Sequence, residues 1–468
     1  MGAAMGGGSD LTALTVAELA GLLAQRKISS VELTDACLAR IARHNEALHA
    51  FIAIYADEAR TAAKAADLAR SAGYALGPLH GIPFGLKDLV DLEGKVTTGG
   101  SKVWEKRVSP STGTLARTLV ANGMIVAGKT HTVEFAFGAW GTNQHMGAPR
   151  NPWDMREART PGGSSSGSGV AVAARLVPWA VGTDTGGSVR IPSALCGITG
   201  LKTTIGQVAT DGILPLSTTL DTPGPLARSA TDTAILFAAM RGADARVIDA
   251  VLNGPPPRGV QGLRLARMPD NERDVCEPAV LAAYDASLAQ LADMGAEIVD
   301  VTLPFRIKDF GALTGRLIAA EGYSFLKGII DDPAAPVDEA VRARFAVARS
   351  MTVTDYLRLL REREAMSAAA DTALADVDAL LTPTTPMTAH PTATAEQQNI
   401  VPSHFTRMAN FLGRCALAVP NGFSPSGLPT SLHIVCAANA EAMALRIGRA
   451  YQTVTDWHRR APSLDGVA

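Results

Sequence analysis

The chain has few aromatic and few charged residues, and it has no long hydrophobic run. Aromatic residues make up 5% and charged residues 19% of its 468 residues, whereas hydrophobic residues make up 47%. No apolar run reaches the roughly 18 residues of a membrane-spanning helix, so we expect no membrane partner. The low aromatic content argues against a broad apolar binding channel. The apolar fraction is nevertheless high enough for a large buried core, which excludes a disordered chain.

An excess of basic residues is also missing. The chain has 43 Lys and Arg residues against 45 Asp and Glu residues, which gives a net charge of −2. Proteins that bind nucleic acid normally carry a basic excess, because the phosphate backbone dominates their affinity. We therefore expect no nucleic-acid partner.

Cysteine and histidine patterns that hold disulfides or metals are absent. The cysteine count is odd, no CxxC pair occurs, and the nine histidines include no HExxH motif. We expect neither a disulfide framework nor a metal site, and no cofactor. The five cysteines are Cys37, Cys196, Cys276, Cys415 and Cys436.

The first ten residues are rich in glycine and lack the charged and apolar parts of a signal peptide. We expect residues 1–10 to be a flexible lead-in and the protein to be cytoplasmic. Residues 11–468 are expected to form one domain. Its expected parts are a core at about 70–235, a helical region at about 255–400, and a C-terminal return to the core at 401–468.

Alternating strand and helix patterns predict the fold class. Thr15 to Glu18 and Ser29 to Glu32 both fit a capping box, which predicts the starts of two helices. Further along the chain, short β-like runs alternate with helical ones, which favours an α/β fold with a mixed central sheet covered by helices on both faces. The expected strands are 124–127, 177–181 and 430–435, and the expected helices are 56–72, 165–176, 231–240, 277–294 and 440–457.

Two short motifs match known sites only superficially. Gly123 to Thr130 fits the P-loop pattern, but its middle residues Met-Ile-Val-Ala favour a buried strand over an open phosphate loop. Gly163 to Gly167 fits the nucleophile elbow of α/β-hydrolases around Ser165. That elbow needs an apolar strand in front of it, and the preceding segment is polar and contains proline.

Three blocks between residues 81 and 225 are more specific, because uncommon features follow one another in order. The first places Lys87 after an apolar run, the second is a Gly/Ser loop that leads into a helix, and the third is a Gly turn that follows a strand. The blocks are Gly81-Ile-Pro-Phe-Gly-Leu-Lys87-Asp88, Arg159-Thr-Pro-Gly-Gly-Ser164-Ser-Ser-Gly-Ser-Gly169 and Gly182-Thr-Asp-Thr-Gly-Gly-Ser188-Val-Arg190-Ile-Pro192. At these residues, and over most of its length, the chain resembles the amidase signature family.

The resemblance implies the amidase signature fold, an acyl-transfer reaction and a role for each matching residue. Ser188 corresponds to the nucleophile, Ser164 to the bridging serine of a cis peptide, and Lys87 to the general base. The backbone N–H groups of Thr185, Gly186, Gly187 and Ser188 correspond to the oxyanion hole. Ser165 and Asp184 correspond to residues that support the site by hydrogen bonding.

The chemistry of these residue types agrees with the resemblance. A serine hydroxyl is a weak nucleophile until a neighbouring base takes its proton. A lysine can be that base only when it is neutral, so it must be desolvated. The apolar and Gly-rich flanks of Lys87 suit this, and we expect Asp88 to point away from it.

The resemblance leaves two functions open. One is a stand-alone amidase that hydrolyses a small carboxamide or urea-type amide. The other is the A subunit of a glutamine-dependent tRNA amidotransferase, which supplies ammonia to a partner subunit. That subunit usually carries Gln directly before the Pro of the third block, where this chain has Ile191. We therefore favour hydrolysis. Homodimers are frequent among relatives, so a homodimer is a further option.

The sequence says less about the substrate. We expect the pocket walls to come from residues 135–140, including Phe135 and Trp140, and from the stretch after Gly311. Arg316, Tyr323 and Arg407 are candidates for binding a polar or anionic substrate. With so few aromatic residues, a compact polar substrate such as a urea derivative is favoured over a bulky apolar one.

Overall fold

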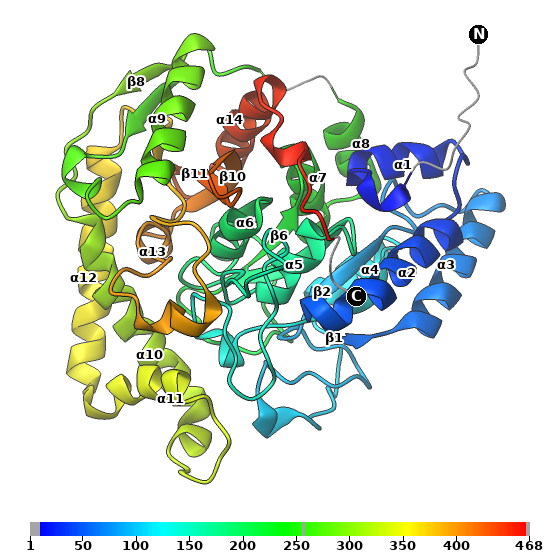
Figure 1. Cartoon of the computed structure of the whole chain (residues 1–468), viewed down its shortest axis with the longest axis horizontal. Coiled ribbons are helices and arrows are strands. Elements are labelled where there is room, and N and C mark those ends of the chain that lie inside the picture. Colours follow the sequence, from blue (N-terminus) through cyan, green and yellow to red (C-terminus); the bar gives the residue numbers. More distant parts are fainter. Residues whose placement is uncertain (1–9, 255–257, 465–468) are drawn as a thin grey trace.

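A single large sheet runs through the molecule (Figure 1). The computed structural model describes residues 10–254 and 258–464, so nearly all of the expected lead-in lies outside the described residues. The eleven strands of these ranges pair in the order β1-β3-β2-β4-β6-β5-β10-β11-β9-β7-β8. Their bounds are β1 Phe51–Ile54, β2 Pro83–Lys87, β3 Ile125–Thr130, β4 Trp179–Asp184, β5 Thr199–Lys202, β6 Thr222–Ala227, β7 Arg264–Arg267, β8 Glu297–Val299, β9 Ala379–Pro383, β10 Cys415–Phe423 and β11 Pro429–Cys436.

Helices precede, connect and follow these strands. In Figure 1 the helices α2 and α3 lie at one side of the molecule, and α10 to α12 lie at the opposite side. The α-helices are α1 Val16–Ala24, α2 Ser30–Leu48, α3 Ala56–Ser71, α4 Thr114–Ala121, α5 Ser166–Ala173, α6 Arg190–Cys196, α7 Ala230–Met240, α8 Ala245–Asn253, α9 Pro278–Asp293, α10 Phe310–Ile330, α11 Glu339–Ala346, α12 Val353–Ala373, α13 Thr406–Phe411 and α14 Glu441–Val454.

The sheet is mixed, as predicted. Strand β2 runs parallel to both β3 and β4, and β7 runs parallel to β8 and β9, whereas the other pairs are antiparallel. The predicted strands correspond to β3, β4 and β11, and the predicted helices to α3, α5, α7, α9 and α14. The main differences lie at element ends: α14 stops at Val454, and β3 and β4 each extend three residues further.

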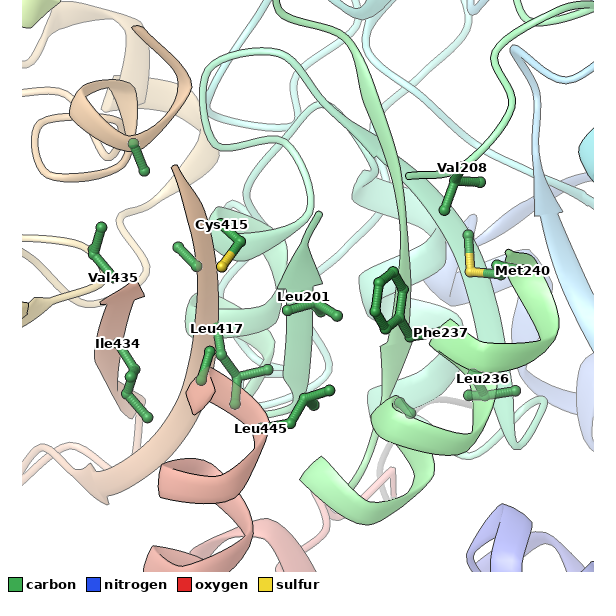
Figure 2. Close-up of a cluster of buried hydrophobic side chains, with 14 of the residues drawn as sticks. Leu201, Val208, Leu236, Phe237, Met240, Cys415, Leu417, Ile434, Val435 and Leu445 are labelled. Atoms are coloured by element: carbon green, nitrogen blue, oxygen red, sulfur yellow. The ribbon is translucent and has the colours of Figure 1, made fainter. Parts of the chain in front are cut away.

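Helices cover both faces of the sheet because neighbouring strand residues point to opposite sides. On β5, Leu201 belongs to the apolar cluster under α7 and α14, where Leu417 and Leu445 also lie (Figure 2). A Cβ atom added to the neighbouring Gly200 would instead lie 2.1 Å from the Ser193 hydroxyl of α6. The site described below lies where β2 and β4 end and where α5 and α6 begin.

The N-terminal helices begin where the sequence predicts. Thr15 and Glu18 form a complete capping box at the start of α1, and Ser29 and Glu32 form one at the start of α2. Each box satisfies N–H groups that the first helical turn leaves without partners. Within the described residues, no helix combines the length and the apolarity that crossing a membrane requires.

Candidate active site

Lys87 is the last residue of β2, a strand that is buried along its whole length between β3 and β4. The side chain is completely buried. Its Nζ atom lies 2.8 Å from the hydroxyl of Ser164 and 2.8 Å from the hydroxyl of Thr183. The strand therefore delivers an amine into the interior, where its two partners are hydroxyl groups.

Burial lowers the pKa of Lys87 to about 7, although Asp184 and Asp221 oppose the shift. Burial has this effect because it penalises the charged form of an amine. The neighbouring Asp88 faces away, as expected from the alternation along a strand. It accepts from the backbone N–H of Thr98 at 2.9 Å and lies 3.3 Å from Nζ of Lys129.

Lys129 belongs to the segment that matches the P-loop pattern. Residues 125–130 form the buried strand β3, and the Lys129 ammonium is enclosed by Asp88, the Val90 carbonyl and Thr97. An open phosphate-binding loop is absent from this segment.

Ser164 follows a cis peptide bond from Gly163. Its carbonyl oxygen accepts from the Thr132 hydroxyl at 3.0 Å and from the Val133 N–H at 3.2 Å. A Cβ atom at Gly163 would lie 2.8 Å from the Gly138 carbonyl oxygen, so no side chain fits there. These contacts fix the backbone that presents the Ser164 hydroxyl to Lys87.

Ser188 lies in the turn between β4 and α6, and its carbonyl oxygen accepts from the N–H of Ser165 at 3.2 Å. The Ser165 hydroxyl in turn donates to the Thr183 carbonyl at 3.2 Å. Ser188 is 7% exposed and lines a cavity. In the described part of the chain no hydrogen bond joins the hydroxyls of Ser164 and Ser188. Of the two contacts that a relay from Ser188 to Lys87 requires, only the Lys87–Ser164 hydrogen bond is therefore formed.

Asp184 holds the turn that contains Ser188. Its buried carboxylate accepts from Nε and Nη2 of Arg190, each at 2.9 Å, and from the Asn410 amide at 2.8 Å. Burial opposes ionisation, but Arg190 holds the pKa of this carboxyl well below its usual value. The Asp184 carboxylate also accepts from the Gly187 N–H at 2.8 Å.

That last contact bears on one predicted role. In this conformation the Gly187 N–H donates to Asp184 and not toward the cavity. Among the residues that the structure describes, the N–H groups of Thr185, Gly186 and Ser188 have no backbone or side-chain acceptor. Three of the four N–H groups predicted for the oxyanion hole thus have no acceptor among these residues and are free to donate.

Asp221 supports the same turn from the other side. Its carboxylate accepts from the Thr185 hydroxyl and from the N–H groups of Leu216 and Ser217. Burial raises the pKa of Asp221 to about 6 in spite of these hydrogen bonds. Asp221 also acts electrostatically on Lys87.

The cavity beside Ser188 has a volume of about 110 Å³. Two candidates for substrate binding, Trp140 and Arg407, line it together with Ala136 to Ala139, Gly186 and Ile191. A second cavity of about 390 Å³ shares Ala136, Thr185 and Leu216 with the first and also touches Thr183 and Asp221. A larger cleft of about 1160 Å³ between α1, α7 and α14 contains none of the predicted site residues.

Three predicted substrate-binding residues lie elsewhere. Phe135 has a positive φ of 49° and packs edge-on against Trp104 in the core, with a centroid distance of 5.0 Å. Arg316 is exposed, because it lies two positions before the cavity-lining Ile318 and therefore on the opposite face of α10. The Tyr323 hydroxyl donates to Asp331 at 2.6 Å, away from the cavity.

Five supporting residues were given no role in the sequence analysis: Thr132, Thr183, Arg190, Asp221 and Asn410. Arg190 and Thr183 stand inside the third block, so their position was a usable signal. Asn410 contacts Asp184 across 226 positions of sequence, and nothing local marks it. In residues 10–254 and 258–464, no group of three His, Cys, Asp or Glu side chains is arranged to hold a metal ion.

Comparison with known proteins places this geometry in a family. A profile of the Amidase family matches residues 32–445. The chain is 37% identical to 2-amino-5-chloromuconic acid deaminase of Comamonas testosteroni, over 93% of this chain and 94% of that protein. It is 35% identical to the A subunit of the glutamyl-tRNA(Gln) amidotransferase of Chloroflexus aggregans, over 97% of this chain and 99% of that protein.

Solved structures agree with the sequence comparison. The native peptide amidase of Stenotrophomonas maltophilia matches with a TM-score of 0.82 and 29% identity, over 96% of this chain and 98% of that one. The profile match covers most of the chain, and the relatives are similar over nearly their full length. The protein is thus an enzyme that hydrolyses amide C–N bonds, and it belongs to the amidase signature family.

Proposed function

We propose that the chain hydrolyses a small carboxamide or urea-type amide through an acyl-enzyme on Ser188. One observation carries the proposal: a buried lysine with a pKa of about 7 contacts the Ser164 hydroxyl at 2.8 Å, next to the turn that presents Ser188 to a cavity. A lysine that is half neutral at pH 7 can accept a proton at the pH at which the enzyme works.

The proposed reaction starts with a proton relay. Neutral Lys87 takes the Ser164 proton, Ser164 takes the Ser188 proton, and the Ser188 oxygen attacks the amide carbonyl carbon. Rotation of the Ser188 side chain makes the contact with Ser164. The N–H groups of Thr185, Gly186 and Ser188 receive the developing negative charge, which is the term that contributes most in comparable enzymes.

The second half of the reaction returns the protons. Lys87 passes its proton through Ser164 to the leaving nitrogen, so the C–N bond breaks and ammonia or an amine departs. Water then adds to the ester of Ser188 through the same relay, the ester C–O bond breaks, and the carboxylic acid leaves. Ser165 and Asp184 position the turn throughout.

The relatives support two versions of this chemistry. One relative is named for deaminating 2-amino-5-chloromuconic acid, and another belongs to a tRNA amidotransferase. The apolar Ile191 lines the cavity at the position where the transferase subunit usually carries Gln. We therefore propose a stand-alone hydrolase with a small-molecule amide as its partner, and the second candidate is the amidotransferase A subunit.

Ammonia release by the purified chain alone, without ATP or added metal, distinguishes the stand-alone hydrolase from the amidotransferase A subunit. The panel contains simple carboxamides, aryl amides, urea-type amides and glutamine, and Ser188→Ala is the control. Release from one small amide that is lost in Ser188→Ala supports the hydrolase. Release from glutamine alone supports the amidotransferase, and equal activity of Ser188→Ala contradicts both versions.

A further inference from the structure

The cavity beside Ser188 contains a positive charge that no neighbouring carboxylate balances. Arg407 lies on α13, and none of the ion pairs within residues 10–254 and 258–464 includes it. Its Nη1 atom donates to the Gly311 carbonyl at 2.5 Å, and its Nε atom is buried without a hydrogen-bond partner in these ranges. The other cation of the cavity, Arg344, is neutralised by Glu396 at 2.7 Å.

The fold places this guanidinium directly beside the turn of the nucleophile. A Cβ atom added to Gly186 would lie 3.6 Å from Cγ and 3.8 Å from Nε of Arg407. A Cβ atom at Gly315 of α10 would lie 3.7 Å from its Nη1. The Arg407 side chain therefore lies between α10 and the turn that holds Ser188, next to Gly186 of that turn.

A second unpartnered polar group lines the same cavity. The Ser403 hydroxyl is buried and has no hydrogen-bond partner among the described residues. Ser403 precedes Arg407 by one helical turn, and its carbonyl accepts from the Arg407 N–H at 3.3 Å. Residues four apart project to the same side of a helical turn. The two donors thus face the cavity together.

An unbalanced cation in such a place is costly unless a ligand balances it. Burial and the nearby Arg344 lower the pKa of Arg407 to about 10, so the side chain stays charged at neutral pH. A charge taken out of water without a counter-ion destabilises the fold, and a carboxylate restores much of the loss. Arginine matches a carboxylate especially well, because its planar fork can donate two parallel hydrogen bonds.

We propose that the substrate is an amide that carries a carboxylate, which Arg407 binds, with the Ser403 hydroxyl as a further donor, while the amide carbonyl lies at Ser188. This inference rests on the proposed function and names its substrate class. A Cβ atom at Gly186, two residues before Ser188, would lie 3.8 Å from Nε of Arg407, so only a short connection fits between the two groups. The class is therefore the monoamide of a short dicarboxylic acid, or a urea-type amide with a carboxylate at the same distance.

The test compares kcat/KM for malonamic, succinamic and glutaramic acids with that for the corresponding diamides, which have the same size and no charge. The wild-type enzyme is expected to prefer at least one acid over its diamide. Replacing Arg407 by Met should lower kcat/KM for that acid by about 10- to 100-fold more than kcat/KM for the diamide, the usual size of a charge-assisted contact. Arg407→Lys should restore part of the preference.

Arg316→Met is the matched control, because Arg316 is a cation on the outer face of α10 and should affect neither substrate. Binding is measured independently by calorimetry with Ser188→Ala and the dianions malonate, succinate and glutarate. At least one dianion is expected to bind, and the Ser188→Ala/Arg407→Met double variant is expected not to bind it. The same dianion should protect the wild-type enzyme from a fluorophosphonate that labels Ser188, which gives a readout that does not depend on folding of the Arg407 variants.

The inference is overturned if the acid and its diamide are cleaved equally well, or if Arg407→Met lowers both rates by the same factor. It is also overturned if none of the dianions binds or protects. These outcomes leave the proposed function standing, provided that cleavage of the diamide depends on Ser188. Activity that survives in Ser188→Ala, or a fluorophosphonate that labels another residue, contradicts the proposed function itself.

Discussion

The identity of its partners distinguishes Lys87 from the other buried lysines. Lys129 contacts the Asp88 carboxylate and the Val90 carbonyl besides the Thr97 hydroxyl, and Lys202 donates to the carbonyl oxygens of Thr203 and Arg414. Carboxylates and carbonyls accept hydrogen bonds and cannot donate a proton, so these partners favour the ammonium form. The side-chain partners of Lys87 are two hydroxyls, which can exchange a proton with it. A lysine that acts as a base therefore needs burial, which favours its neutral amine, together with neighbouring hydroxyls that can donate a proton to it.

The first prediction concerns pH. Because the neutral form of Lys87 is the base and its pKa is about 7, kcat/KM should rise with pH through about 7 and then level off. Initial rates from pH 5 to 9 with a small amide measure this. Lys87→Met should remove the activity at every pH, and a rate that falls between pH 6 and 8 would contradict the assignment.

The second prediction concerns Asp221. Its negative charge raises the pKa of Lys87, so Asp221→Asn should lower that pKa and shift the rising limb of kcat/KM to lower pH. The Thr185 hydroxyl also loses its charged acceptor, so the plateau rate should fall. A thermal melt of the variant checks that it is folded. A limb that stays in place or moves to higher pH would contradict the predicted effect of Asp221 on the pKa of Lys87.

At the scale of elements, the turn from β4 to α6 depends on one buried ion pair. The Asp184–Arg190 pair is completely buried, and Arg190 also donates to the Thr406 carbonyl and to the Asn410 side chain. These contacts connect the turn that holds Ser188 to α13, the helix that carries Arg407. The nucleophile and the proposed carboxylate site thus share one support.

The third prediction follows from that burial. Arg190→Met leaves a buried carboxylate without its partner, which typically costs about 3–5 kcal/mol of folding free energy. Chemical denaturation measures the loss. The control is Arg60→Met, because Arg60 and Asp35 form an exposed pair, and such pairs contribute about 0–1 kcal/mol. Equal losses of folding free energy in the two variants would contradict the claim that the β4–α6 turn depends on Arg190.

Sequence predicts the parts of the site that lie inside short blocks. Lys87, Ser164 and Ser188 each stand in a local pattern of glycines and apolar residues, and the helix starts at Thr15 and Ser29 are similarly local. The use of the Gly187 N–H by Asp184 could not be predicted, because it depends on how the turn closes. Asn410 reaches the site only through the tertiary fold, so no local pattern marks it. Arg407 was one of the candidates for substrate binding, but no motif distinguishes it from Arg316 and Tyr323, which lie away from the cavity.

At the scale of the whole molecule, one sheet joins the distant parts of the chain. Strand β1 begins at Phe51 and β11 ends at Cys436, and both belong to the same eleven-stranded sheet. The lysine comes from β2, the third strand from the β1 edge of this sheet. The cavity is lined by the turn that holds Ser188 and also by residues 136–140, Arg344 and several residues between 396 and 407. Several of these walls come from segments far in sequence from the blocks that hold Lys87, Ser164 and Ser188, which is why the sequence predicts the reaction better than the substrate.

Trapping the acyl-enzyme tests the central claim most directly. The enzyme is mixed with an activated ester or anilide that deacylates slowly, quenched in acid, digested and analysed by mass spectrometry. The account predicts one added acyl group on the peptide that contains Ser188, and none in Ser188→Ala or Lys87→Met. An acyl group on Ser165 or any other residue, or unchanged acylation of Ser188→Ala, would contradict it.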